Sequence, residues 1–271
     1  MFMRLFIWLL CVWLWPLGVN AVELRWEGQF TQGGLIIGQA PPGTRLELDG
    51  EPVAVAADGL FVFGFTRDAP TRARLRIVSP QGEVEERSLT ITARAYNVQR
   101  LNGLPPDKVT PPPKLLERIR RENARVAQAR QPEIPEPYFR SGFAWPTVGR
   151  ISGVYGSQRI LNGEPRQPHY GVDIAAAVGT PVRAPADGVV ILAEPDLYYT
   201  GATLIIDHGY RLSSTLMHLD RIDAKVGQRV HKGDIVATVG QSGRVTGPHL
   251  DWRMHWREAR IDPALLVPPM R

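Results

Sequence analysis

Cysteine is almost absent from this chain of 271 residues, because Cys11 is the only one. It lies inside an apolar N-terminal segment and is followed by bulky apolar residues, which is unlike the cysteine of a lipoprotein anchor. The rest of the sequence therefore forms no disulfide and offers no thiol as metal ligand or nucleophile. Any catalysis must depend on histidines and carboxylates.

Net charge is also small, at +5 at pH 7, and it is spread along the chain. This excess would suit an anionic polymer such as cell-wall material, although a basic balance alone usually serves solubility. The sequence has no motif in which arginines alternate with aromatic residues as in nucleic-acid-binding proteins. We therefore expect no nucleic acid partner.

Residues 1–21 have the pattern of an export signal. Arg4 supplies a positive start, an apolar run follows, and Val19-Asn20-Ala21 offers small residues for cleavage. The alternative is a membrane anchor, but the apolar run is short for a full span and Pro16 interrupts its end. We expect a periplasmic or secreted protein of the cell envelope that meets the membrane only through this transient signal peptide.

Residues 22–98 lack histidine and predict a β-sandwich-like domain. Short runs alternate apolar with polar residues, and turn signals such as Asp49-Gly50 and Asp58-Gly59 separate them. The predicted strands include 35–37, 45–48, 60–63 and 73–78. We expect mainly a structural unit, with spacing, docking or target binding as its role.

Residues 99–137 predict a proline-rich connector with one basic helix. Pro111-Pro112-Pro113 stiffens an extended stretch, and apolar residues at helical spacing predict a helix between Lys114 and Arg130. This helix either packs on a neighbouring domain, which we favour, or offers a basic surface to an anionic wall polymer. A second proline-rich stretch follows at 131–137.

Residues 138–271 lack a long amphipathic helix and predict antiparallel strands with long loops. The strand patterns lie at 188–193, 202–207, 214–219 and 234–239. The fold class is therefore mainly β. It combines an N-terminal β-sandwich-like domain, a proline-rich and helical connector, and a C-terminal antiparallel β domain.

His169 and Asp173 are the first candidates for chemistry. Their spacing would place both on one face of a helix, but Pro168 and Gly171 argue against a helix there. In a straight strand the two would share a face about 13 Å apart. Convergence on one ion therefore requires a bend, which Gly171 is suited to supply.

His249 and Asp251 form the second pair. Polar and apolar residues alternate after them, so both are expected on one face of a strand. Arg253 lies on the same face, where an ion pair with Asp251 would compete with a metal. His255 lies too far along the strand, about 13 Å, to replace Asp251.

His218 is a third candidate, near the end of a predicted strand. With the two pairs it supplies three imidazoles and two carboxylates, enough to hold a zinc ion and to act on its water. His208 and His231 have the surroundings of loop residues and are not assigned to the site.

Residues 138 to about 265 resemble the lysostaphin/LytM-type zinc metallopeptidases, which cleave peptide cross-links in peptidoglycan. The matching segments, in the family's order, are 168–174, 179–188, 217–219, 226–230 and 247–250. The resemblance implies Zn²⁺ as cofactor and His169 and Asp173 as metal ligands. It also implies that His218 and His249 are the two catalytic histidines beside the metal.

Asp251 departs from the family's pattern, in which the third ligand is the second His of a His-x-His pair. Aspartate oxygen is an acceptable zinc ligand, at about 2.0–2.2 Å from the metal. Two carboxylates would, however, neutralise the ion and weaken its pull on the bound water. We therefore expect a metal set of His169, Asp173 and Asp251, with a weaker ion than a set of two histidines and one aspartate.

The sequence favours an exported zinc endopeptidase that acts on the stem peptides of peptidoglycan. The alternative is a non-catalytic regulator that binds wall peptides or activates a separate amidase, with that amidase or an envelope protein as its partner. A third interpretation places the function in the N-terminal β-domain and treats the rest as a scaffold.

Overall fold

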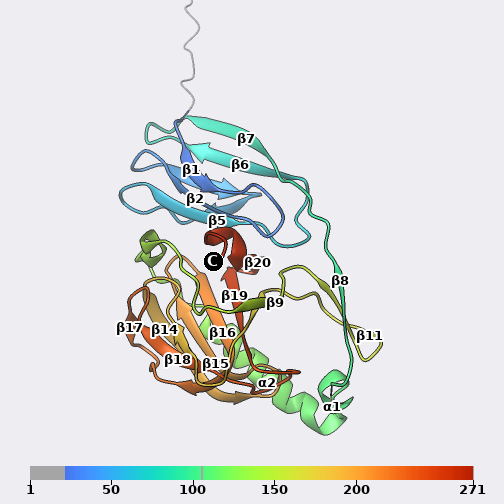
Figure 1. Cartoon of the computed structure of the whole chain (residues 1–271). Coiled ribbons are helices and arrows are strands. Elements are labelled where there is room, and N and C mark those ends of the chain that lie inside the picture. The colour runs from blue at the N-terminus through green and yellow to red at the C-terminus, as the bar shows by residue number, and fades with distance from the viewer. Residues whose placement is uncertain (1–21, 105, 271) are drawn as a thin grey trace, which may run out of the picture.

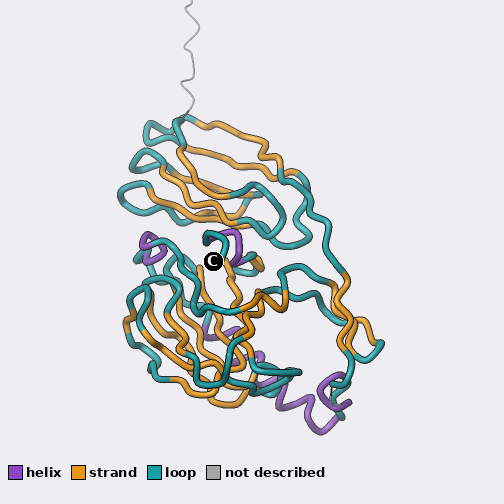
Figure 2. The backbone as a smooth tube through the Cα atoms, viewed as in Figure 1, coloured by secondary structure: helices purple, strands orange, loops and turns teal. Residues whose placement is uncertain are grey.

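Strands dominate the molecule, as Figure 2 shows, so the prediction of a mainly β fold is confirmed. The computed structural model describes residues 22–104 and 106–270, and the predicted export signal lies outside the described residues. Within those ranges, no helix has the length and apolar character that crossing a bilayer requires.

Two antiparallel sheets pack together at the N-terminal end (Figure 1). One has the order β1-β2-β5 and the other the order β4-β3-β6-β7. The strands are β1 (Arg25–Gly28), β2 (Leu35–Gln39), β3 (Arg45–Leu48), β4 (Glu51–Val53), β5 (Leu60–Gly64), β6 (Arg72–Val78) and β7 (Val84–Thr90). Leu75 and Ile77 of β6 are fully buried, whereas Arg74 is exposed and Arg76 is half-buried, as the period of two requires.

The connector leaves these sheets along one side of the molecule (Figure 1). Its strand β8 (Val98–Leu101) runs parallel to β10 (Gln158–Leu161), which pairs in turn with β11 (Glu164–Pro165). Helices α1 (Pro106–Val109) and α2 (Pro113–Ala129) follow. The predicted helix between Lys114 and Arg130 is thus observed as α2, and it packs on β14 (Gly188–Leu197), as we favoured.

A large antiparallel sheet carries the C-terminal half, in the order β17-β14-β15-β16-β19-β12-β9. Besides β14, the strands of this half are β9 (Arg150–Gly153), β12 (Val172–Ala175), β13 (Pro181–Arg183), β15 (Gly201–Asp207), β16 (Leu212–Ile222), β17 (Arg229–Val230), β18 (Ile235–Val239), β19 (His249–Trp256) and β20 (Ala259–Ile261). Only short 3-10 turns, η1 (Tyr138–Ser141) and η2 (Pro263–Leu266), are helical in its described residues. Leu250 and Trp252 of β19 are fully buried, which anchors this strand in the core.

The N-terminal sheets dock against the end of the C-terminal sheet. Asp262 donates its backbone N–H to Gly33 at 2.8 Å, and its carboxylate pairs with Arg94 at 2.8 Å. Ile261 belongs to the same apolar cluster as the core of the N-terminal sheets. The N-terminal sheets therefore contact the end of β20, which pairs with β19, the strand that carries His249 and Asp251.

His208 follows β15 directly and is fully buried, outside the candidate site as predicted. Its Nδ1 lies 2.7 Å from the carbonyl of Asp187 and its Nε2 lies 2.7 Å from Ser214 Oγ. Burial lowers the pKa of His208 from 6.5 to about 4. The unfolded chain therefore binds a proton at this residue before the folded protein does.

We expect the free energy of unfolding to fall as pH drops below 6.5 and to keep falling toward pH 4. This one group should cost about 2 kcal/mol between pH 7 and pH 5. Urea unfolding of His208→Gln should show a shallower pH slope by that amount, whereas His231→Gln, a change at an exposed histidine, should keep the wild-type slope. Equal slopes in all three proteins would contradict this assignment.

Candidate metal centre

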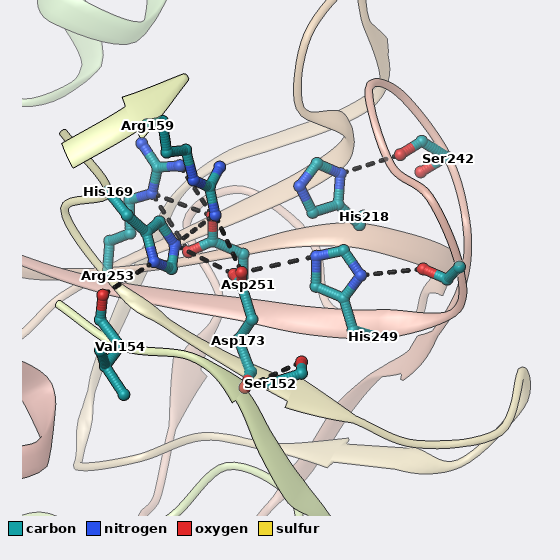
Figure 3. A network of polar contacts seen from close by, with 11 residues as sticks. Ser152, Val154, Arg159, His169, Asp173, His218, Ser242, His249, Asp251 and Arg253 are labelled. Atoms are coloured by element: carbon teal, nitrogen blue, oxygen red, sulfur yellow. Dashed lines mark hydrogen bonds and ion pairs between the residues drawn. The ribbon is translucent and has the colours of Figure 1, made fainter. Parts of the chain in front are cut away.

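Strands β12 and β19 pair with Asp173 directly opposite Asp251. His169 lies in the irregular segment before β12, and the chain bends at Gly171, so the predicted bend is observed in place of a helix. His169 Nε2 lies 3.0 Å from Asp173 Oδ1 and 3.3 Å from Asp251 Oδ2 (Figure 3). All three side chains are buried.

The donor atoms of this cluster fit a divalent cation. They lie within 4.8 Å of one another, and tetrahedral zinc with bonds of about 2.0–2.1 Å requires spacings of roughly 3.3 Å. Asp173 Oδ1 is buried and accepts no hydrogen bond from a described residue. His169 Nδ1 lies 3.3 Å from the carbonyl of Val154 and can donate a proton to it. His169 Nε2 then has a free lone pair, which points toward the same place as the lone pairs of Asp173 Oδ1 and Asp251 Oδ2. Such a point attracts a proton or a metal ion.

A guanidinium group already contacts each carboxylate. Arg253 Nη2 lies 2.7 Å from Asp251 Oδ2 and its Nε lies 3.1 Å from Oδ1, so the ion pair expected from the sequence is present. Arg159 Nη2 lies 2.9 Å from Asp173 Oδ2. The two carboxylates and two guanidinium groups balance in formal charge, and an added metal ion must share Asp251 with Arg253.

The electrostatics of the cluster keep Asp251 ionised and favour a proton on His169. Burial alone raises the pKa of Asp251, but Arg253 and His169 outweigh it and hold that pKa well below its usual range. Burial lowers the pKa of His169, but Asp251 and Asp173 raise it above its usual value. A proton therefore competes with a metal ion for His169, so metal binding must weaken in acid.

His218 and His249 lie side by side at the edge of the cluster, with ring centroids 4.9 Å apart (Figure 3). His249 Nε2 lies 3.8 Å from Asp173 Oδ1. Each Nδ1 lies 2.8 Å from a backbone carbonyl, that of Ser242 for His218 and that of Gly247 for His249. When the Nδ1 protons are donated to those carbonyls, both Nε2 atoms remain free as proton acceptors.

His218 adopts a left-handed backbone conformation, with φ of 62°. The pairing of β16 with β15 shifts register between Leu216 and Leu219, across this residue, and the pairing with β18 shifts just after it, which marks a bulge. Strained residues and bulges occur where a side chain must be re-aimed toward a site. Burial lowers the pKa of His218 to about 4, so its imidazole is neutral at pH 7.

A groove of about 110 Å³ opens beside the cluster and is lined by Asp173, His218 and His249. The connector supplies part of its wall through Leu101 and Leu104. Asn162, which lies near His169 in sequence, contacts the connector: its Nδ2 donates to the carbonyl of Leu104 at 2.7 Å. Arg159 lines the same groove, as expected for the segment 159–167, although it lies in β10 and not in the predicted loop.

Tyr170 and His255 lie outside the cluster of His169, Asp173 and Asp251. The guanidinium of Arg260 lies 5.4 Å from the centre of the Tyr170 ring. His255 is on the Asp251 face of β19 but lines a separate cavity beneath α2. His231 is exposed and 3.7 Å from Asp234, so it takes no part in the site.

Comparison with known proteins gives the class of this fold and site. Residues 167–263 match Peptidase family M23. A crystal structure of a Pseudomonas aeruginosa protein assigned to peptidase M23 is 30% identical, covers 88% of this chain and 95% of its own, and superposes with a TM-score of 0.67. The chain therefore belongs to Peptidase family M23, as the resemblance to lysostaphin/LytM-type enzymes indicated.

Two curated relatives are similar over part of the chain. The peptidoglycan DD-endopeptidase ShyA of Vibrio cholerae is 38% identical over 106 residues, which are 39% of this chain and 24% of ShyA. The cell division protein DipM of Caulobacter vibrioides is 30% identical over 132 residues, which are 46% of this chain and 21% of DipM. The chain thus spans about a quarter of the length of these relatives.

Gly171 provides a test of the cluster's geometry. A Cβ at this position would lie 2.5 Å from Asp251 Oδ1 and 2.7 Å from the backbone oxygen of Trp252. Gly171→Ala should therefore push β12 away from β19 and lower zinc affinity at least about tenfold. Calorimetric zinc titration measures this, and Gly247→Ala, where a Cβ has open space, is the control. Equal affinities in the two variants would show that His169 and Asp251 need not approach each other to bind zinc.

Proposed function

We propose that this chain is a zinc-dependent peptidase of the cell envelope that hydrolyses peptide cross-links of peptidoglycan. The observation that supports this most is the convergence of His169, Asp173 and Asp251 beside two imidazoles with free Nε2 atoms. The names of relatives such as ShyA agree with a peptidoglycan peptide as substrate.

His169 Nε2, Asp173 Oδ1 and Asp251 Oδ2 would hold the zinc ion. When bound, zinc supplies Lewis acidity for a peptide carbonyl and for a water of lowered pKa. The first role left to the protein is to accept a proton from that water. The second is to deliver a proton to the departing amine.

His249 is suited to the proton transfer because it is partly exposed to the groove and its Nε2 faces Asp173. Its Nδ1 is held by the carbonyl of Gly247, which fixes the ring and leaves Nε2 to take the proton. His218 binds a proton poorly, since burial lowers its pKa to about 4. We therefore assign His218 to positioning, as an acceptor for an N–H or O–H of the reacting groups.

A second candidate function is a non-catalytic regulator that binds wall peptides or activates a separate amidase. The specific observation in its favour is the Arg253–Asp251 ion pair, at 2.7 Å, which holds the third ligand position. Adding a divalent ion to a buried cluster whose charges already balance costs solvation energy that a His-x-His pair without an arginine would not incur. The groove beside the two histidines would then bind peptides without cutting them.

Asp251→His tests the third ligand position. Because the change restores two histidines and one aspartate and removes the anion that Arg253 neutralises, zinc affinity should rise about tenfold or more. The double variant Asp251→His/Arg253→Gln also removes the unpaired guanidinium and should bind zinc at least as tightly. Calorimetry on protein stripped with chelator measures both. Unchanged affinity in both variants would exclude Asp251 from the metal set.

His249→Ala should abolish release of soluble peptides from purified peptidoglycan while zinc stays bound at the wild-type stoichiometry. The expected loss is at least about a hundredfold, the usual effect of removing a general base. Metal analysis and chromatography of the released fragments are the two readouts, and His231→Ala is the matched surface control. Loss of zinc in His249→Ala would mean that this residue is a ligand.

If the chain is a regulator, a different result is expected for the wild-type protein. It would contain no stoichiometric zinc and would release no fragments with Zn²⁺, Co²⁺ or Mn²⁺, yet it would sediment with peptidoglycan. Zinc at one equivalent together with released fragments supports the peptidase instead.

A further inference from the structure

A second cavity lies between α2 and the sheet, and it shares no lining residue with the groove. It encloses about 170 Å³. Since one water takes roughly 30 Å³ in the liquid, this volume holds a small ligand. The walls include Arg130 after α2, Thr215 of β16 and Arg253 of β19.

Positive charge dominates this cavity. Arg130, Arg253 and Arg260 line it, and only Arg253 has an ion pair, with Asp251. Neither Arg130 nor Arg260 lies within 4.0 Å of a described acidic group. Burial, together with repulsion from Arg260 and Arg253, lowers the pKa of Arg130 to about 10. Two guanidinium groups thus face the cavity without a counter-ion.

The acidic residue of the wall does not supply that counter-ion. Glu122 accepts a hydrogen bond from Arg118 Nε at 2.6 Å and another from the backbone N–H of Tyr198 at 2.8 Å. Both of its oxygens are therefore bound to groups other than Arg130.

His255 adds an unpartnered polar group to the same wall. It is 3% exposed, and neither ring nitrogen has a hydrogen-bond partner among the described residues. Burial lowers its pKa well below the ordinary value, so the ring is neutral and carries one N–H donor. A buried donor without an acceptor is costly, and an anion in the cavity would accept its hydrogen bond.

We propose that this cavity binds a small oxyanion, either a carboxylate or an inorganic oxyanion such as sulfate. Arg253 borders the cavity and also contacts Asp251 at 2.7 Å, so the cavity lies one side chain away from the candidate metal site. An anion held there would neutralise the guanidinium groups of Arg130 and Arg260 and accept the N–H of His255.

The test measures anion binding to metal-free protein. Sodium sulfate, N-acetyl-D-alanine and N-acetyl-D-alaninamide are titrated by calorimetry, and thermal unfolding is followed in parallel, with chloride used to hold ionic strength constant. We expect the acid and sulfate to bind and to raise the unfolding temperature, and the amide to do neither. Arg130→Gln and Arg260→Gln should each weaken anion binding at least about tenfold, as expected for loss of a charged hydrogen bond. Arg120→Gln, on the exposed side of α2, is the matched control and should bind as the wild type does.

The other possible results of these titrations also support or overturn the proposed anion site. Binding of sulfate without N-acetyl-D-alanine keeps the anion site but assigns it to a free inorganic ion. Absence of binding by both, or full binding in the double variant Arg130→Gln/Arg260→Gln, overturns the proposal. Arg260→Lys keeps the charge, so retained binding in this variant guards against a misfolded Arg260→Gln protein. Because no metal or turnover is involved, failure of the peptidase proposal leaves these results interpretable.

Discussion

The site is governed by one buried carboxylate, Asp251, whose charge must be balanced by neighbours because almost no water reaches it. Three groups compete for that role: the imidazole of His169 when protonated, the guanidinium of Arg253, and a metal ion. The low exposure of the cluster strengthens each of these attractions and penalises any arrangement that leaves the charge unpaired. A metal ion that bound here would therefore replace the proton of His169 and share Asp251 with Arg253.

Much of this arrangement is predictable from local patterns. The period of two after His249 correctly places Asp251, Arg253 and His255 on one face of β19. The bend at Gly171 is predictable because a straight strand would separate His169 from Asp173. The helix α2 and most strands of both halves also follow from spacing and turn residues, since these depend on neighbours in sequence.

The remainder depends on contacts between distant segments, for which a single sequence has no local signal. Arg159 lies on β10, which pairs with β8 of the connector, and it forms an ion pair with Asp173. The left-handed conformation of His218 accompanies register shifts in the pairing of β16 with its neighbours. No residue near His218 in the sequence signals this conformation. The cationic cavity exists because α2 brings Arg130 over the face of β19, although the sequence separates the two widely.

The connector contributes residues to the groove beside the candidate metal site and to the cavity beneath α2. Leu101 and Leu104 border the groove, and Arg130 borders the cavity beneath α2. Trimming the chain to start at Tyr138 would remove Leu101 and Leu104 from the groove and Arg130 from the cavity, besides deleting the N-terminal sheets. A C-terminal fragment for experiments should therefore begin before Val98, so that it keeps the residues that line both the groove and the cavity.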